Sequence, residues 1–185
     1  MAARRLRAVL DVVIAVVRAD DAPGPMRLQR LLEAEGCTVL RCEGGEGNPG
    51  GGSGQAARGR AEGMGTSIAS GVRATAHAQG WIIALADMPN VRVETVHALR
   101  QALCQGAASA APYYRGRRGH PVAFGAACGP ALAALTGDRG GRAILEHHRP
   151  VRIDVDDPGI LFDVDVPADL TGAHATEDGR GADFT

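Results

Sequence analysis

The stretch WIIALADMPN, residues 81–90, runs from apolar residues into a carboxylate, and Met-Pro follows at once. Its first seven residues predict a buried strand, because they form a short apolar run that ends on the charged Asp87. Asp87 has two possible roles: a metal ligand that the strand delivers to a cleft, or the cap of the next helix. Taken alone, the position favours the cap, so the rest of the chain must decide.

Short apolar runs alternate with amphipathic stretches on both sides of this strand. The expected strands lie within 10–21, at 37–42, at 81–87, on both sides of a basic turn in 109–125, and at 151–155. The expected helices lie within 24–36, 63–80 and 91–103, with two short ones in 129–149. This alternation predicts a three-layer α/β domain with a mainly parallel sheet, in which ligands bind at the carboxyl ends of the strands.

The 185 residues are enough for one domain, which we place at residues 1–171. The glycine-rich, polar segment 43–62 has nothing to bury and predicts a flexible loop, and the polar residues 172–185 predict a disordered tail. A phosphate-binding loop is the sharper interpretation of 43–62, but the fixed glycine spacing and the following Lys of a P-loop are missing.

Composition excludes several classes of protein. The formal net charge is −1, which gives no electrostatic case for a nucleic-acid partner. The four cysteines form no Cys-x-x-Cys pair, which is typical of idle thiols in a reducing cytosol. No apolar run is long enough to span a bilayer. We therefore expect a cytoplasmic protein with no nucleic-acid or membrane partner.

Asp163 and Asp165 form a second acidic motif, in FDVDVP. In an extended segment, residues two apart point the same way, so the two carboxylates share a face. They repel each other unless a cation or water lies between them, and oxygen ligands of this kind suit Mg²⁺. The alternative is that DVDDPG and DVDVP are solvated turn edges.

Two further motifs have the chemistry to bind phosphate or polar ligands. GMGTS, residues 63–67, places backbone amides at the start of a helix that Thr66 or Ser67 would cap. RGRRGHP, residues 115–121, places three Arg and His120 in a turn between strands, and Arg binds phosphate through paired donors. The alternatives are a tight turn with a helix cap for the first motif and a solvated hairpin tip for the second.

Together, and in order, five motifs resemble one family: EGMGTSIASGV, LADMP, YRGRRGHPVAFG, LTGDRGGRAIL and DVDVPADL. They are similar to the molybdenum cofactor cytidylyltransferases, within the molybdopterin nucleotidyltransferases that have a Rossmann-like NTP-transferase domain. The resemblance covers about residues 5–171. The combination of Gly-Met-Gly-x-Ser with Arg-Gly-His-Pro and Gly-Asp-x-Gly favours the cytidylyl branch over the guanylyl branch.

The resemblance implies transfer of CMP from CTP to a molybdopterin-type cofactor, with release of pyrophosphate. It also implies Mg²⁺ as cofactor and, as a further partner, a client molybdoenzyme or its chaperone. Asp87 and Asp165 would be catalytic, and the remaining roles also follow from the motifs. The implied site residues are Asp87, Asp163 and Asp165 for the metal; Gly63, Met64, Gly65, Ser67 and Asp87 for the nucleotide; and Arg117, Arg118, Gly119 and His120 for the pterin substrate.

The chain departs from this family at its start. Members open with a strand and a loop of the type Leu-Ala-Ala-Gly-x-x-x-Arg-Met-Gly, followed by a Lys, and this sequence has neither the loop nor any Lys. A missing central strand would leave its two neighbours with unpaired backbone groups. We expect a start upstream of Met1 or a truncated copy. Alternatives are an inactive relative that binds nucleotide or cofactor, or an enzyme that uses GTP or another phosphorylated acceptor.

Overall fold

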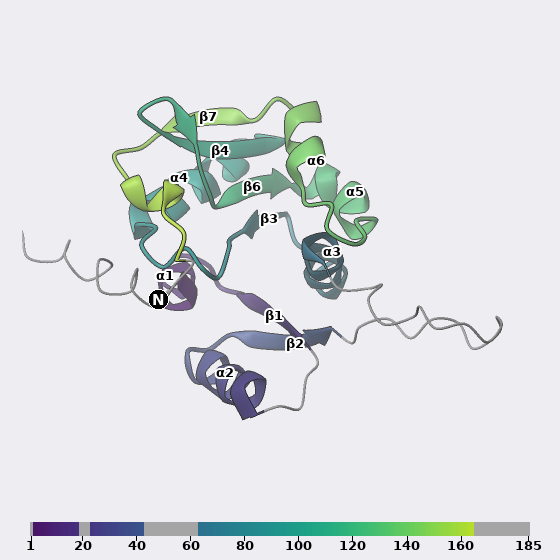
Figure 1. Cartoon of the computed structure of the whole chain (residues 1–185). Helices are drawn as coiled ribbons and strands as arrows, with labels where there is room; N and C mark the ends of the chain where they lie inside the picture. The colour runs from purple at the N-terminus through teal and green to yellow at the C-terminus, as the bar shows by residue number, and fades with distance from the viewer. Residues whose placement is uncertain (1, 19–22, 43–62, 165–185) are drawn as a thin grey trace, which may run out of the picture.

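The computed structural model describes residues 2–18, 23–42 and 63–164; the segment 43–62, Asp165 and the tail lie outside them. The described helices and strands alternate along the chain, as predicted (Figure 1). They are α1 (Ala2–Arg7), β1 (Ile14–Arg18), α2 (Pro23–Ala34), β2 (Thr38–Cys42), α3 (Met64–Ala74), β3 (Gly80–Ile83), α4 (Val93–Cys104), β4 (Ser109–Tyr114), β5 (Arg117–Arg118), β6 (Val122–Gly125), η1 (Ala126–Cys128), α5 (Gly129–Ala133), α6 (Arg142–His147), β7 (Val151–Asp154) and η2 (Pro158–Leu161).

The strands form two sheets. β1 and β2 pair in parallel, with Ile14 opposite Thr38. In the larger sheet the order is β3-β6-β4-β5, and β7 pairs with β4 in parallel. β6 runs antiparallel to both β3 and β4, so β3, β4 and β7 point the same way and end at one edge. The α/β class is confirmed, with β5 and β6 reversed relative to the other strands of this sheet.

The break between the two sheets lies between β1 and β3. Within the described residues, β1 pairs only with β2, and β3 pairs only with β6. Figure 1 shows β1, β2 and α2 apart from the larger sheet.

Helices cover both faces of the larger sheet. Successive residues of a strand point to opposite faces, so neighbours belong to different clusters. Ala123 packs with Leu99 of α4 on one face. Phe124 packs with Leu132 of α5 on the other, where α3 and α6 also contribute. The three-layer arrangement is therefore confirmed.

A third apolar cluster supports the edge at which β3, β4 and β7 end. It joins α1, the loop after β3, α4 and η2, and its buried members are Val9, Met88, Val91, Val96 and Ile160. The four cysteines are free thiols. Among the described residues, no helix has the length and apolar character to cross a membrane.

Candidate functional site

The segment that carries Asp87 is a turn rather than the end of a strand. β3 stops at Ile83, and Asp87 lies four residues further on, in the loop to α4. Its carbonyl oxygen accepts a hydrogen bond of 2.8 Å from the amide of Val164. The Asp87 side chain is exposed, while the adjacent Met88 is 6% exposed and anchors the loop in the core. The backbone of Asp87 therefore lies beside the segment that contains Asp163.

A different carboxylate, that of Asp157, caps η2 and ties it to the start of α4. Arg92 is the N-cap residue, and its amide donates to Oδ2 of Asp157 at 2.8 Å. The hydroxyl of Thr95 donates to the same oxygen at 2.6 Å. The interpretation of Asp87 as the helix cap is therefore wrong. The solvated-turn interpretation of DVDDPG is also wrong for Asp157, which is 2% exposed, although it holds for the exposed Asp156.

His120 is hydrogen-bonded to η2 through its backbone. Its amide donates to the carbonyl oxygen of Ile160 at 2.9 Å. Burial lowers the pKa of His120, the Arg118 guanidinium lowers it further, and the negative charge of Asp87 offsets part of this shift. The imidazole Nδ1 is buried and has no hydrogen-bond partner among the described residues. The structure thus brings an imidazole with an unpartnered Nδ1 into the electrostatic range of Asp87.

The carboxylates of Asp87 and Asp163 each have the chemistry to bind a divalent cation. Both side chains are exposed, and neither makes a hydrogen bond or ion pair within the described part of the chain. No group of three or more His, Cys, Asp or Glu side chains gathers within that part, and the predicted ligand Asp165 lies outside it. Two carboxylates suit Mg²⁺ or Mn²⁺, which fill their other positions with phosphate and water.

The GMGTS motif packs against the loop 136–140. The amide of Gly65 donates to the carbonyl oxygen of Gly137 at 2.8 Å, and the amide of Gly137 donates to Thr66 Oγ1 at 3.0 Å. A Cβ on Gly63 would lie 2.2 Å from the carbonyl carbon of Gly137, so glycine permits this close backbone contact. The N-cap residue is Gly63, with no side-chain cap, so the prediction of Thr66 or Ser67 as cap is wrong.

The GMGTS motif has no direct hydrogen-bond or ion-pair link to the predicted metal ligands among the described residues. No hydrogen bond or ion pair among residues 63–164 joins the GMGTS motif to Asp87 or Asp163. Met64 is 49% exposed at the start of α3, and Ser67 is half-buried one turn further on. The nucleotide-binding role of Gly63, Met64, Gly65 and Ser67 stays a prediction.

The four residues predicted to face the pterin have different environments. Arg117 is exposed on β5, whereas Arg118 is partly buried, with Nη2 3.7 Å from Oε1 of Glu146. A Cβ on Gly119 would lie 2.2 Å from the carbonyl oxygen of Ile160, so this glycine lets the chain pack on η2. Gly119 and His120 thus lie at the carboxyl edge of the sheet with Asp87.

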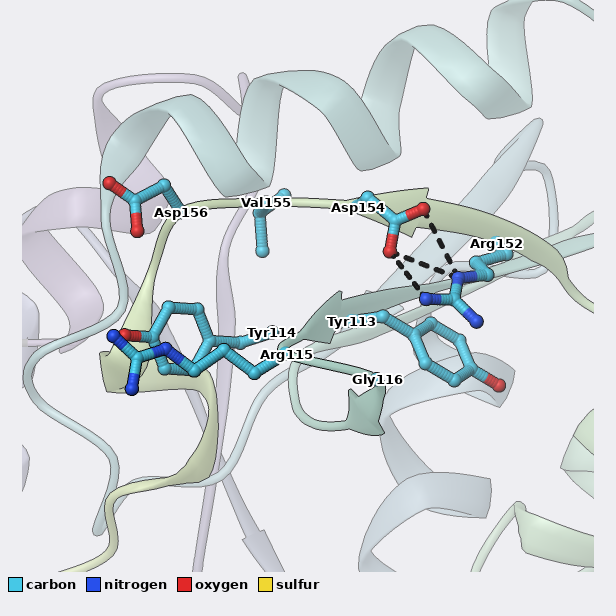
Figure 2. A pocket seen from close by; sticks show the side chains of 8 residues that line it. All are labelled: Tyr113, Tyr114, Arg115, Gly116, Arg152, Asp154, Val155 and Asp156. Carbon is cyan, nitrogen blue, oxygen red and sulfur yellow. Dashed lines mark hydrogen bonds and ion pairs between the residues drawn. The ribbon is translucent and has the colours of Figure 1, made fainter.

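A shallow pocket of about 640 Å³ lies at the ends of β4 and β7. Figure 2 shows its lining residues, with Arg152 held by two-pronged hydrogen bonds to Asp154 of 2.8–3.1 Å. The Arg152 guanidinium lies 4.7 Å from the ring centroid of Tyr113. The Arg152 guanidinium is thus already paired, whereas the Arg115 guanidinium lies 5.1 Å from the ring centroid of Tyr114. Its lining residues are Tyr113, Tyr114, Arg115, Gly116, Arg152, Asp154, Val155 and Asp156.

Comparison with known proteins gives a family and a fold. Residues 1–151 match the model of the MobA-like NTP transferase domain. The solved Rv0371c homologue from Mycobacterium sp. strain JC1 is 22% identical, with a TM-score of 0.63 over 92% of this chain and 79% of that one. Rv0371c from Mycobacterium tuberculosis H37Rv is 22% identical, with a TM-score of 0.62 over 93% and 81%. No curated protein matches the chain.

A further structure of Rv0371c from Mycobacterium tuberculosis H37Rv is a complex with manganese. It is 20% identical to this chain, with a TM-score of 0.61 over 93% of this chain and 82% of that one. At these identities, the likeness to solved structures establishes the shared fold.

Proposed function

The chain belongs to the family of MobA-like NTP transferase domains, and from this premise we propose that it transfers CMP from CTP to a molybdopterin-type cofactor. One observation carries the proposal: the bond from the Val164 amide to the Asp87 carbonyl holds two unpaired carboxylates, Asp87 and Asp163, on adjacent segments. Unpaired carboxylates at the carboxyl edge of an α/β sheet suit a cation that carries a nucleotide triphosphate.

In the proposed reaction, a phosphate oxygen of the pterin cofactor attacks the α-phosphorus of CTP. The bond from that phosphorus to the bridging oxygen breaks, and pyrophosphate leaves. A bound divalent cation, Mg²⁺ in this proposal, supplies neutralising charge at the triphosphate. Asp87 and Asp163, with Asp165, would hold it. The protein's own task is alignment of the two phosphates, because such a transfer requires little covalent chemistry from side chains.

His120 is suited to the acceptor phosphate. Its Nδ1 is buried and has no hydrogen-bond partner among the described residues. A hydrogen bond between Nδ1 and a bound ligand would remove the free-energy cost of leaving this buried polar atom unpaired. Arg117 and Arg118 would contribute positive charge to the same phosphate. Gly63, Met64, Gly65 and Ser67 would surround the cytosine and ribose. The amide of Gly65 already donates to the carbonyl oxygen of Gly137. Gly65 would therefore contribute close packing against the nucleotide rather than a hydrogen bond.

The test is pyrophosphate release by the purified chain with Mg²⁺, the molybdopterin cofactor and either CTP or GTP. We expect release with CTP, and its loss in Asp87→Ala. Asp156→Ala is the matched control, because Asp156 is an exposed carboxylate on the same side of the domain with no proposed role.

Three results would contradict parts of this proposal. Faster turnover with GTP would refute the choice of nucleotide. Full turnover in a folded Asp87→Ala protein would refute the metal assignment. Calorimetric binding of CTP without any pyrophosphate release would favour the alternative of a binding protein, which the absence of Lys in the sequence also supports. A client molybdoenzyme or its chaperone remains the proposed partner for a cytoplasmic enzyme of this kind.

A further inference from the structure

The carboxylate of Asp157 is buried among donors from two different segments. The residue is 2% exposed. Its Oδ2 accepts hydrogen bonds from the Arg92 amide at 2.8 Å and the Thr95 hydroxyl at 2.6 Å. Its Oδ1 accepts one from the Gly159 amide at 2.9 Å. A buried carboxylate is costly unless it is fully hydrogen-bonded, so these contacts fix its position.

Two of the three donors belong to the start of α4, at the end of the loop that carries Asp87. A negative charge at a helix N-terminus is stabilising, because the unpaired amides there carry partial positive charge. The guanidinium of Arg92 adds a hydrogen bond of 2.6 Å from Nη1 to the carbonyl oxygen of Asp156. The beginning of α4 is therefore tied to the segment that follows β7.

The third donor belongs to η2, which lies directly on the Asp87 loop. A Cβ on Gly159 would lie 2.3 Å from the carbonyl oxygen of Asn90, so the two backbones are in close contact. The carbonyl oxygen of Ile160, in the same turn, accepts the hydrogen bond from the His120 amide. The chain then leads to Asp163, and the Val164 amide donates to the Asp87 carbonyl at 2.8 Å.

The segments 87–92 and 157–164 are thus joined at both ends. Asp157 and Arg92 close one end, and Val164 and Asp87 close the other. We propose that Asp157 is a positioning residue that fixes Asp87 relative to Asp163 and thereby sets the affinity of the site for a divalent cation. This inference rests on the proposed function, and it assigns a role to a residue that touches neither metal nor substrate.

The test uses Mn²⁺ alone as the probe, titrated into the purified full chain and followed by electron paramagnetic resonance. Asp157→Asn keeps the shape but replaces one acceptor with an NH₂ group that meets an amide donor. We expect Mn²⁺ affinity to fall roughly tenfold, the lower end of the range for residues that support metal ligands. Hydrogen exchange of the Val164 and His120 amides should be faster in the metal-free variant.

Two controls separate positioning from general stability. Asp156→Asn changes the adjacent exposed carboxylate and should leave Mn²⁺ affinity unchanged. Leu99→Val removes volume from a fully buried position of α4 that packs in a different apolar cluster. It should lower the unfolding temperature without changing Mn²⁺ affinity or the exchange of the Val164 amide.

The outcomes distinguish the inference from the proposed function. Equal Mn²⁺ affinity in wild type and folded Asp157→Asn overturns the inference alone. Absence of Mn²⁺ binding to the wild-type chain refutes the proposed metal site, and the inference falls with it. If Asp157→Asn does not fold, Thr95→Val replaces it, because this change removes one donor and keeps the side-chain shape. A loss of Mn²⁺ affinity supports the inference, and unchanged affinity overturns it.

Discussion

Substitution of Gly65 by Ala should destabilise the protein through a collision with backbone atoms. A Cβ at this position would lie 2.3 Å from the carbonyl oxygen of Arg139 and 2.9 Å from that of Gly137. Backbone oxygens cannot swing aside as side-chain ends do. To restore a separation of about 3.0 Å, the loop 136–140 has to move by about 0.7 Å relative to α3.

The expected loss follows from two contributions. Overpacking of a close contact costs about 1–3 kcal/mol. The same movement weakens the 2.8 Å hydrogen bond between the Gly65 amide and the Gly137 carbonyl, worth about 0.5–1.5 kcal/mol. Together they lower the free energy of unfolding by about 2–4 kcal/mol, which corresponds to a decrease in Tm of roughly 4–16 °C for a chain of this size.

Gly71→Ala, in the same helix, is the matched control with the opposite sign. A Cβ there would lie 3.6 Å from Cγ2 of Val16, which is an ordinary contact. Ala in a helix interior is more favourable than Gly by about 0.5–1 kcal/mol, so Tm should rise. Circular dichroism melting and urea titration measure both variants. Equal or higher stability of Gly65→Ala, or parallel shifts of both variants, would refute the close contact with loop 136–140.

Three further predictions concern the site and the core. Asp87→Ala should change the free energy of unfolding by less than about 0.5 kcal/mol, because this exposed carboxylate makes no hydrogen bond or ion pair among the described residues. A loss above about 1 kcal/mol in a urea titration would contradict the absence of a structural role for this carboxylate. The pKa of His120 is lower in the folded chain than in the unfolded chain, so the unfolded chain binds a proton at this imidazole more readily. The stability that the neutral imidazole contributes is therefore complete above about pH 6.5 and is lost as the pH falls through the folded-state pKa. Urea unfolding at about pH 7.5 and pH 5.5 should therefore show a smaller loss in His120→Gln than in the exposed control His97→Gln, and equal losses would contradict the lowered pKa. Phe124→Ala should cost about 3–5 kcal/mol, because Phe124 is 0% exposed, whereas Phe162→Ala, at 37% exposure, should cost much less; similar melting temperatures would contradict the described core.

The alternation of elements was predictable because it depends on residues close together in the chain. The apolar face of residues 91–103 predicted a helix, and α4 spans Val93–Cys104. The predicted strand 81–87 was too long, since β3 ends at Ile83. The residues after it turn so that the Asp87 carbonyl meets the Val164 amide, and no local pattern indicates a partner that far along the chain.

The connections between the segments of the candidate site were not predictable from the sequence. The sequence offered Asp87 as cap or ligand, but the N-cap residue of α4 is Arg92. The carboxylate buried at that helix end is Asp157, whose partners Arg92 and Thr95 lie 65 and 62 residues away. In the sequence, Asp157 is indistinguishable from the exposed Asp156 beside it.

The sequence by itself determined the α/β class, the order of helices and strands, and a set of motifs typical of nucleotidyltransferases. Only the tertiary structure decided which carboxylate is buried and which is free, and that the glycines of GMGTS pack against loop 136–140. The physical reason is that secondary structure follows from periodicity over a few residues, whereas a buried polar group must find its donors wherever the fold brings them. For Asp157 those donors come from α4 and η2, which meet only in the folded chain.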